Sequence, residues 1–107
     1  MLLRISILAV LLAATMGAPP VALAEGDAQA GRIKAETCIG CHGIEGYKNT
    51  YPTFRVPKLK GQHGSYIALS LRAYRSGERK HPTMHSQASA LSDQDIDDIA
   101  AYIESLK

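Results

Sequence analysis

The chain has 107 residues, with 12 basic and 10 acidic side chains and a formal net charge of +2. This length suits one small domain, which buries a modest fraction of its surface and has little stability to spare. The exported start described next argues against nucleic acid as a partner.

The first 24 residues are typical of a secretory signal peptide. Arg4 gives a short positive region, residues 5–14 are almost entirely apolar, and Ala22-Leu23-Ala24 forms an A-x-A cleavage site. The alternative is a retained membrane anchor, but the apolar run is shorter than the roughly 20 residues that cross a bilayer. We therefore expect cleavage after Ala24, export to the periplasm, and a soluble mature domain of residues 25–107 without stable membrane insertion. Loss of Arg4 lowers the net charge from +2 to +1.

Residues 25–37 are expected to form the first helix of the mature domain. Gly26 and Asp27 can cap its start, and the alanines that follow are good helix formers. Ile33 and the small residue Gly31 could give this helix one close-packing face. The helix leads the chain directly to its two cysteines.

Both cysteines of the chain lie in the motif Cys38-Ile39-Gly40-Cys41-His42. C-x-x-C-H is the attachment signature of c-type haem. Two thiols at this spacing can add to the two vinyl groups on one porphyrin edge, and the adjacent imidazole can then bind the iron. A zinc site, with nitrogens from His81 and His85, and a redox dithiol are the alternatives. Haem c is favoured because the chain has no second C-x-x-C and no βαβ pattern.

Export and the haem motif agree with each other. Free cysteines in an oxidising compartment tend to pair, and thioether bonds to haem remove them from that chemistry.

Residues 43–62 are expected to form a loop, because glycine and proline recur throughout this segment. The loop also carries half of the aromatic residues of the mature chain, and a haem face is one apolar surface that they could cover. Simple packing under a long loop is the alternative. The aromatic residues concerned are Tyr47, Tyr51 and Phe54.

Residues 64–76 are expected to form a second helix. Ile67, Leu71 and Tyr74 recur at helical spacing and would lie on one face. Gly77 is placed to end the helix.

Met84 follows in a short polar segment, residues 80–85, which is expected to be a loop. It is the one methionine left after removal of the signal peptide. If His42 binds one side of the haem iron, a thioether on the other side raises the potential and closes the iron to exogenous ligands. We therefore predict that Met84 is the second axial ligand, with plain core packing as the alternative. Three histidines are rival ligands: His63, His81 and His85. His81 and His85 could also replace Met84 when conditions change.

The final helix is expected to begin at Ser92, because Ser92 and Asp95 form a pattern like a capping box. Its apolar stripe is best explained as core: Ile96, Ile99, Ile103 and Leu106. The chain contains no strand pattern, so the sequence predicts an all-α domain.

Charge is unevenly distributed along the mature chain. Residues 81–107 hold five acids and one lysine, whereas residues 48–80 hold one acid, Glu78. Such asymmetry can steer the encounter with a charged redox partner, and an ordinary solvated surface is the alternative. Eight basic residues make up the 48–80 region: Lys48, Arg55, Lys58, Lys60, Arg72, Arg75, Arg79 and Lys80.

The order and spacing of these motifs resemble class I c-type cytochromes, in particular the small monohaem cytochrome c4/c553-like group. The resemblance covers nearly all of the mature chain. Five motifs carry it: Gly26-Asp27 and Gly31 leading to Cys38-x-x-Cys41-His42-Gly43, Pro57-Lys58-Leu59-Lys60-Gly61-Gln62, the run from Tyr66 through Leu71 and Tyr74-Arg75 to Gly77 and Arg79, Met84, and Leu91-Ser92-Asp93-x-Asp95-Ile96 with Ala100-Ala101-Tyr102.

This resemblance implies an all-α class I cytochrome c fold, in which the N- and C-terminal helices cross at Gly31 and Tyr102. A further helix and loops would wrap around one covalent haem. One C-x-x-C-H motif excludes two haems in this chain.

The resemblance also implies roles for the site residues. Cys38 and Cys41 would be thioether-linked to the porphyrin, with His42 as proximal and Met84 as distal ligand. The Pro57 carbonyl would accept a hydrogen bond from the His42 ring. Leu59 would pack on the haem, and three further residues would lie near its propionates: Gln62, Tyr66 and Arg79.

The sequence thus predicts a periplasmic electron carrier, not an enzyme, that shuttles single electrons between a donor and an acceptor redox protein. Three alternatives stay open. The first is a haem subunit permanently docked on a dehydrogenase or oxidase. The second is a haem sensor or catalyst with an open distal site. The third is a dithiol oxidoreductase without haem.

Overall fold

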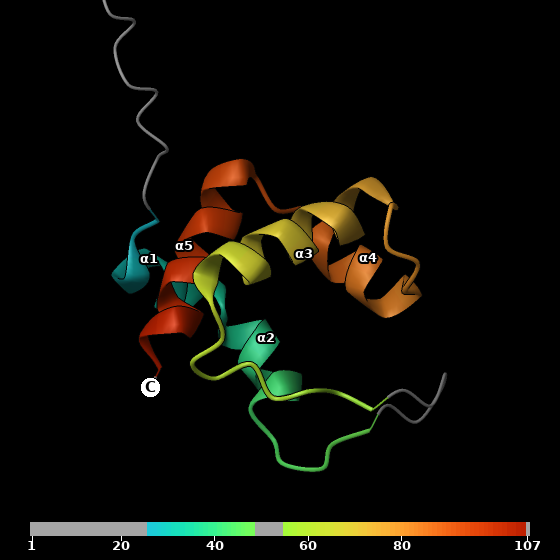
Figure 1. Ribbon diagram of the computed structural model, residues 1–107, viewed down its shortest axis with the longest axis horizontal. Helices are drawn as coiled ribbons and strands as arrows, with labels where there is room; N and C mark the ends of the chain where they lie inside the picture. The colour runs from blue at the N-terminus through green and yellow to red at the C-terminus, as the bar shows by residue number, and fades with distance from the viewer. Residues whose placement is uncertain (1–25, 49–54, 107) are drawn as a thin grey trace, which may run out of the picture.

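The computed structural model describes residues 26–48 and 55–106 (Figure 1). Within these ranges the chain is helical, without a strand, and one isolated bridge joins Lys48 to Arg55. The predicted all-α class is confirmed. The predicted signal peptide, Tyr51 and Phe54 lie outside the described residues. The helices of these two ranges are α1 (Ala28–Lys34), α2 (Glu36–His42), α3 (Gly64–Ser76), α4 (Pro82–Ala88) and α5 (Asp93–Ser105).

The first predicted helix is two helices that meet at Ala35. Asp27 caps α1 as expected, since its side chain accepts hydrogen bonds from the backbone N–H groups of Gln29 and Ala30. At Ala35 the backbone ψ angle is 1°, far from the helical value, and the residue is fully buried. The bend turns α2, which carries the cysteine motif, away from the axis of α1.

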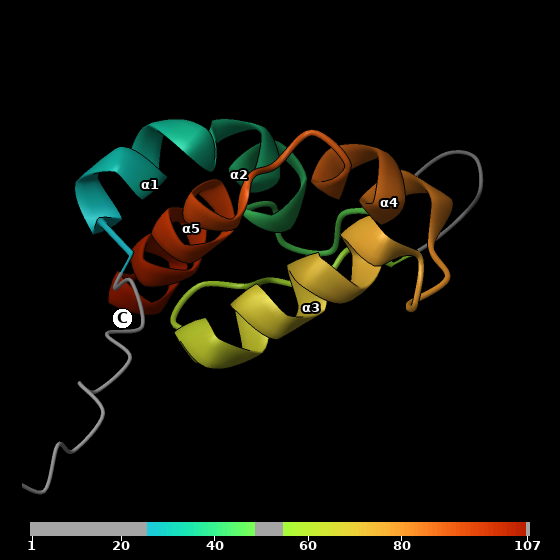
Figure 2. The ribbon, with the colours of Figure 1, turned by 90° about the horizontal axis from the view of Figure 1, so that it is seen from above.

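Helix α1 crosses α5 at Gly31, and the two helices lie against each other in Figures 1 and 2. A Cβ atom at Gly31 would lie 1.9 Å from the Asp98 carbonyl oxygen and 2.9 Å from Cβ of Tyr102. Only glycine permits this approach, so the expected crossing of the terminal helices is confirmed. Ile33 does not contribute to the contact, because 72% of it is exposed.

A buried carboxylate ties the same two helices together. Asp98 on α5 is 3% exposed and accepts hydrogen bonds from Lys34 Nζ at 2.6 Å, the Asp27 N–H at 2.8 Å and Gln94 Nε2 at 2.8 Å. These three donors, the Lys34 ammonium foremost, hold the pKa of Asp98 at about 2. A buried charge is tolerated only when it is paired in this way.

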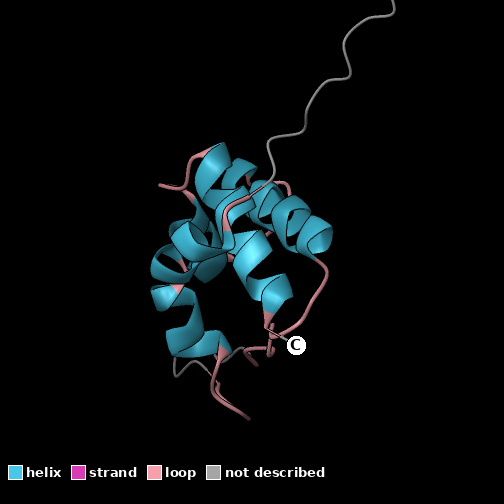
Figure 3. Ribbon diagram, turned by 90° about the vertical axis from the view of Figure 1, so that its left-hand side faces the viewer, coloured by secondary structure: helices cyan, strands magenta, loops and turns pink. Residues whose placement is uncertain are grey.

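The core lies mainly between α3 and α5. Ile67 and Leu71 on α3 are buried, and Gly77 ends this helix with a positive φ of 82°, as predicted. Figure 3 shows the helices packed beside one another, with loops between them. The predicted apolar stripe near the C-terminus is also confirmed. Leu106 is half-buried. Three isoleucines of α5 are fully buried: Ile96, Ile99 and Ile103.

Helix α5 begins with the expected capping box. Ser92 Oγ accepts the Asp95 N–H at 3.1 Å, and Asp95 Oδ2 accepts the Ser92 N–H at 3.0 Å.

No helix of the described ranges has the length and apolar content needed to cross a bilayer.

The polar segment around Met84 is a helix, so the expectation of a loop there is wrong. Pro82 occupies the first turn of α4, where its missing N–H needs no partner and its fixed φ suits a helix start. The His81 side chain accepts the Met84 N–H at 3.3 Å, and Ala88 at the other end is fully buried. Met84 therefore lies in the first turn of a helix that is anchored in the core.

We predict that Asp98→Asn lowers the free energy of unfolding at neutral pH and makes it less sensitive to acid. The carboxylate has a pKa of about 2 in the fold and an ordinary value of 3.8 when unfolded. Its contribution is therefore complete above about pH 5 and is lost as the pH falls through about 2. Urea denaturation of wild type and of Asp98→Asn from pH 7 to pH 2 measures whether their free energies of unfolding converge as the pH falls.

Glu45→Gln is the control for loss of one negative charge, because Glu45 is exposed and forms a long ion pair of 3.5 Å with Lys58. A difference between wild type and Asp98→Asn that is as large at pH 2 as at pH 7 would contradict the prediction.

Candidate functional site

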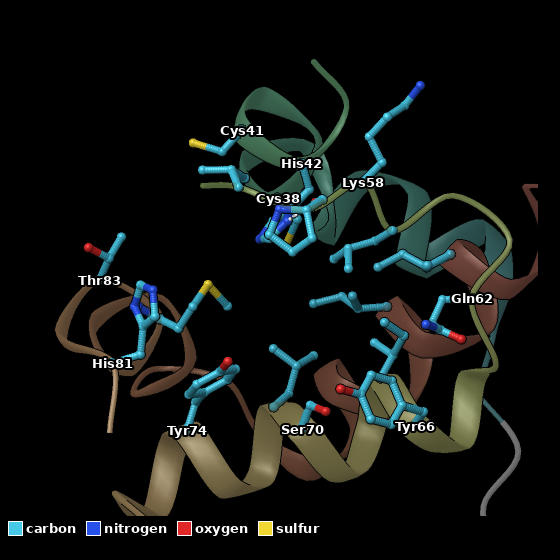
Figure 4. A pocket seen from close by; sticks show the side chains of 18 of the residues that line it. Cys38, Cys41, His42, Lys58, Gln62, Tyr66, Ser70, Tyr74, His81 and Thr83 are labelled. Atoms are coloured by element: carbon cyan, nitrogen blue, oxygen red, sulfur yellow. Dashed lines mark hydrogen bonds between the residues drawn. The ribbon is translucent and has the colours of Figure 1, made fainter. Parts of the chain in front are cut away.

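A cavity of about 370 Å³ lies between α2, α3, α4 and the segment that precedes α3 (Figure 4). Its volume is within the range of small-molecule and cofactor sites. The residues that line it include all four predicted site residues: Cys38, Cys41, His42 and Met84. Of the rival ligands, His81 is among the lining residues, whereas His63 and His85 are not.

Helix α2 sets the geometry of the cysteine motif. Cys41 and His42 follow Cys38 by three and four positions, which places the three side chains on neighbouring parts of one helix surface. Figure 4 shows them along one wall of the cavity, opposite Tyr66 and Tyr74 on α3. The bend at Ala35 delivers this surface to the cavity.

The His42 ring is oriented by the backbone of Pro57. Its Nδ1 lies 2.7 Å from the Pro57 carbonyl oxygen, the contact that the family resemblance implied. A carbonyl can only accept, so Nδ1 carries the proton and donates it. The neutral ring then keeps its lone pair on Nε2, which is the atom available to bind a metal.

The environment of the cysteines disfavours redox dithiol chemistry. Both are half-buried, and Cys38 packs against the hydrophobic core. Burial raises the pKa of the Cys38 thiol. Reactive dithiols depend instead on a lowered thiol pKa. Within the described ranges, no group of three or more His, Cys, Asp or Glu side chains is placed to hold a metal ion.

The wall that carries Met84 is held by contacts around Tyr74, at the end of α3. The His85 ring donates from Nδ1 to the Tyr74 carbonyl oxygen at 2.8 Å. The His81 ring meets the Tyr74 ring edge-on at a centroid distance of 6.0 Å, and the Arg79 guanidinium lies 4.4 Å from the same ring. Tyr74 was predicted as part of an apolar helix face and of a family motif, and these contacts of its ring and carbonyl were not predicted.

The cavity opens onto the hydrophobic core. Among the described residues, eight apolar residues are buried, and four of these also line the cavity: Ile67, Leu71, Ile99 and Ile103. The sequence predicted these four as core only. Leu59 and the three residues that the resemblance placed near the propionates line the cavity too: Gln62, Tyr66 and Arg79.

The residues around the cavity fit a haem c group. The apolar lining suits a large apolar ring, the two thiols can form thioethers, and an imidazole and a thioether are available as axial ligands. Neither a zinc site nor a redox dithiol would use all of these groups together.

Comparison with known proteins identifies the family. Residues 28–107 match the family model described as cytochrome c. Cytochrome c-554(548) of Halomonas halodenitrificans is 46% identical over 83 residues, which cover 75% of this chain and 96% of the relative. Cytochrome c4 of Pseudomonas aeruginosa is 42% identical over 93 residues, and cytochrome c-553 of Helicobacter pylori is 34% identical over 73 residues.

The relatives differ in length. The match covers 87% of this chain and 45% of the Pseudomonas cytochrome c4, so the chain spans about half of that protein. The corresponding shares for the Helicobacter cytochrome c-553 are 68% and 74%. The chain therefore belongs to the cytochrome c family, as a small class I c-type cytochrome whose cofactor is covalently bound haem c and whose function is haem-based electron transfer.

Proposed function

We propose that the chain is a periplasmic monohaem electron carrier, not an enzyme, with His42 and Met84 as the axial ligands of its iron. The observation that carries the proposal is the cavity itself. Its lining combines the C-x-x-C-H motif on α2 with the Met84 side chain on α4. When bound, haem c supplies an iron that alternates between the ferric and ferrous states and so holds one electron.

The residues of α2 would attach and orient the group. Cys38 and Cys41 would form the thioether bonds through Sγ. His42 would bind the iron through Nε2, because its Nδ1 donates to the Pro57 carbonyl oxygen. This hydrogen bond fixes both the tautomer and the direction of the ring.

Met84 would close the opposite axial position. Its place in the first turn of α4 supports this role, because helix and cap restrict the backbone from which the side chain extends. A bound thioether raises the potential and excludes exogenous ligands. Both effects suit electron transfer and disfavour the sensor or catalyst with an open distal site.

Redox proteins would be the donor and the acceptor, and the basic 48–80 region would dock them. Part of this charge is used within the chain. Arg72 pairs with Asp97 at 2.8 Å, Arg75 with Asp93 at 2.6 Å, and Lys58 with the exposed Glu45. The other basic residues of this region would then contact the redox partner. Two of them, Arg55 and Arg79, line the cavity.

We predict that Cys38→Ala/Cys41→Ala contains no covalent haem and does not unfold cooperatively. Half of the buried apolar residues of the described core face the cavity, and a domain this small has little other core to stabilise it. Intact mass and thermal unfolding followed by circular dichroism measure both effects.

Gly40→Ala is the matched control, since it keeps both thiols and its added methyl group would meet nothing within 4 Å. A double variant that stays helical and unfolds cooperatively would show that the haem is not needed for the fold.

We predict that Met84→Ala loses the weak sulfur-to-ferric-iron charge-transfer absorption and that its ferrous form binds carbon monoxide. Removal of the thioether opens the distal position. Thr83→Ala is the control, because Thr83 is the neighbouring residue of α4 and also lines the cavity. Optical spectra of the two oxidised forms, and of the reduced forms under carbon monoxide, give the result.

Retention of the absorption band in Met84→Ala would exclude Met84 as a ligand. Loss of the band without carbon monoxide binding would mean that another side chain had taken the distal position.

A further inference from the structure

We propose that His81 is a positioning residue for Met84, and that it acts by capping helix α4. The inference rests on the proposed function, because it concerns the residue proposed there as the distal ligand. It goes beyond that function in naming what holds the ligand in place.

The first observation is the cap itself. His81 is the N-cap residue of α4, with extended backbone angles, and its Nδ1 accepts the Met84 N–H at 3.3 Å. The neutral ring therefore carries its proton on Nε2. Side-chain caps of this kind satisfy a backbone donor that the helix leaves unpaired. Here that donor belongs to Met84.

The second observation is that the capping ring is itself fixed. The His81 ring meets Tyr74 at 6.0 Å with an interplanar angle of 75°. The Arg79 guanidinium lies 4.4 Å from the same tyrosine ring. The position of the His81 ring, and through it of the Met84 backbone, is thus set by residues at and just after the end of α3.

The third observation is the length of α4, which has seven residues. Helices this short have little stability of their own, so end contacts matter more than in a long helix. His85 provides one further tie, since its ring donates to the Tyr74 carbonyl oxygen at 2.8 Å. This hydrogen bond lies one turn beyond the cap. The first turn, from which the Met84 side chain extends, therefore depends on His81 for its stability.

The size of the effect follows from the strength of such caps. Loss of a side-chain cap changes a local equilibrium by roughly two- to thirtyfold. We therefore expect removal of the His81 acceptor to raise the population of protein with Met84 away from the iron by about this factor.

The experiment compares four variants of the haem-loaded protein with wild type. His81→Ala removes the acceptor and the ring. His81→Leu removes the acceptor but keeps apolar bulk against Tyr74. His81→Asn restores an acceptor of the kind most common at N-caps. His63→Ala is the matched control, because His63 is the N-cap residue of α3 but makes no side-chain cap hydrogen bond.

Three measurements are made on each protein: the sulfur-to-ferric-iron absorption, the rate of carbon monoxide binding to the ferrous form, and the free energy of unfolding. We expect His81→Ala and His81→Leu to bind carbon monoxide roughly two- to thirtyfold faster than wild type and to weaken the absorption band. His81→Asn should return both optical measurements toward wild type, and His63→Ala should leave both unchanged. A residue that only stabilises the fold would change unfolding without opening the distal site.

Wild-type carbon monoxide binding in both His81→Ala and His81→Leu would overturn the proposal, as would failure of His81→Asn to restore the closed site. If His81→Ala does not assemble, His81→Leu and His81→Asn still decide the question. Failure of the proposed function is recognised separately. In that case wild type lacks the absorption band, or Met84→Ala retains it.

Discussion

The close approach of α1 to α5 is the contact on which the rest of the structure depends. Gly31 has no side chain to separate its backbone from the Asp98 carbonyl oxygen, and the Asp98 side chain binds both ends of α1 through Asp27 and Lys34. With α1 fixed in this way, the bend at Ala35 directs α2 toward the cavity. The cysteine motif thus reaches the core because a glycine and a buried carboxylate, neither of which lines the cavity, fix the preceding helix.

Core and site share four buried apolar residues. Ile67, Leu71, Ile99 and Ile103 are buried against one another and also face the cavity. The proposed ligands come from elements at its edge, His42 from α2 and Met84 from α4. Each has a hydrogen-bond partner outside its own helix, the Pro57 carbonyl oxygen for the His42 ring and the His81 ring for the Met84 N–H. These two hydrogen bonds within the protein would help to orient the proposed ligands.

The parts of the fold that local chemistry determines could be predicted from the sequence. Helix α3 has its apolar spacing and Gly77, and α5 has its Ser92 cap, so both were predicted near their observed bounds. The bend at Ala35 was missed because no glycine or proline marks it. Helix α4 was missed because its composition is polar, although Pro82 after a capping residue is a start signal. The motif predicted the cysteines and histidine that line the cavity, but the contacts of Tyr74 and His81 depend on tertiary packing.

The most direct test of a closed distal position is a redox titration of the wild-type protein followed by its optical spectrum, with carbon monoxide added to the reduced form. A closed electron carrier should show the sulfur-to-ferric-iron band when it is oxidised. This band should disappear together with the ferric haem bands in one single-electron step, and the reduced protein should not bind carbon monoxide. An oxidised protein without the band, whose reduced form binds carbon monoxide readily, would contradict it. The distal position would then be open, and a sensor or catalyst would explain the molecule better than a closed electron carrier.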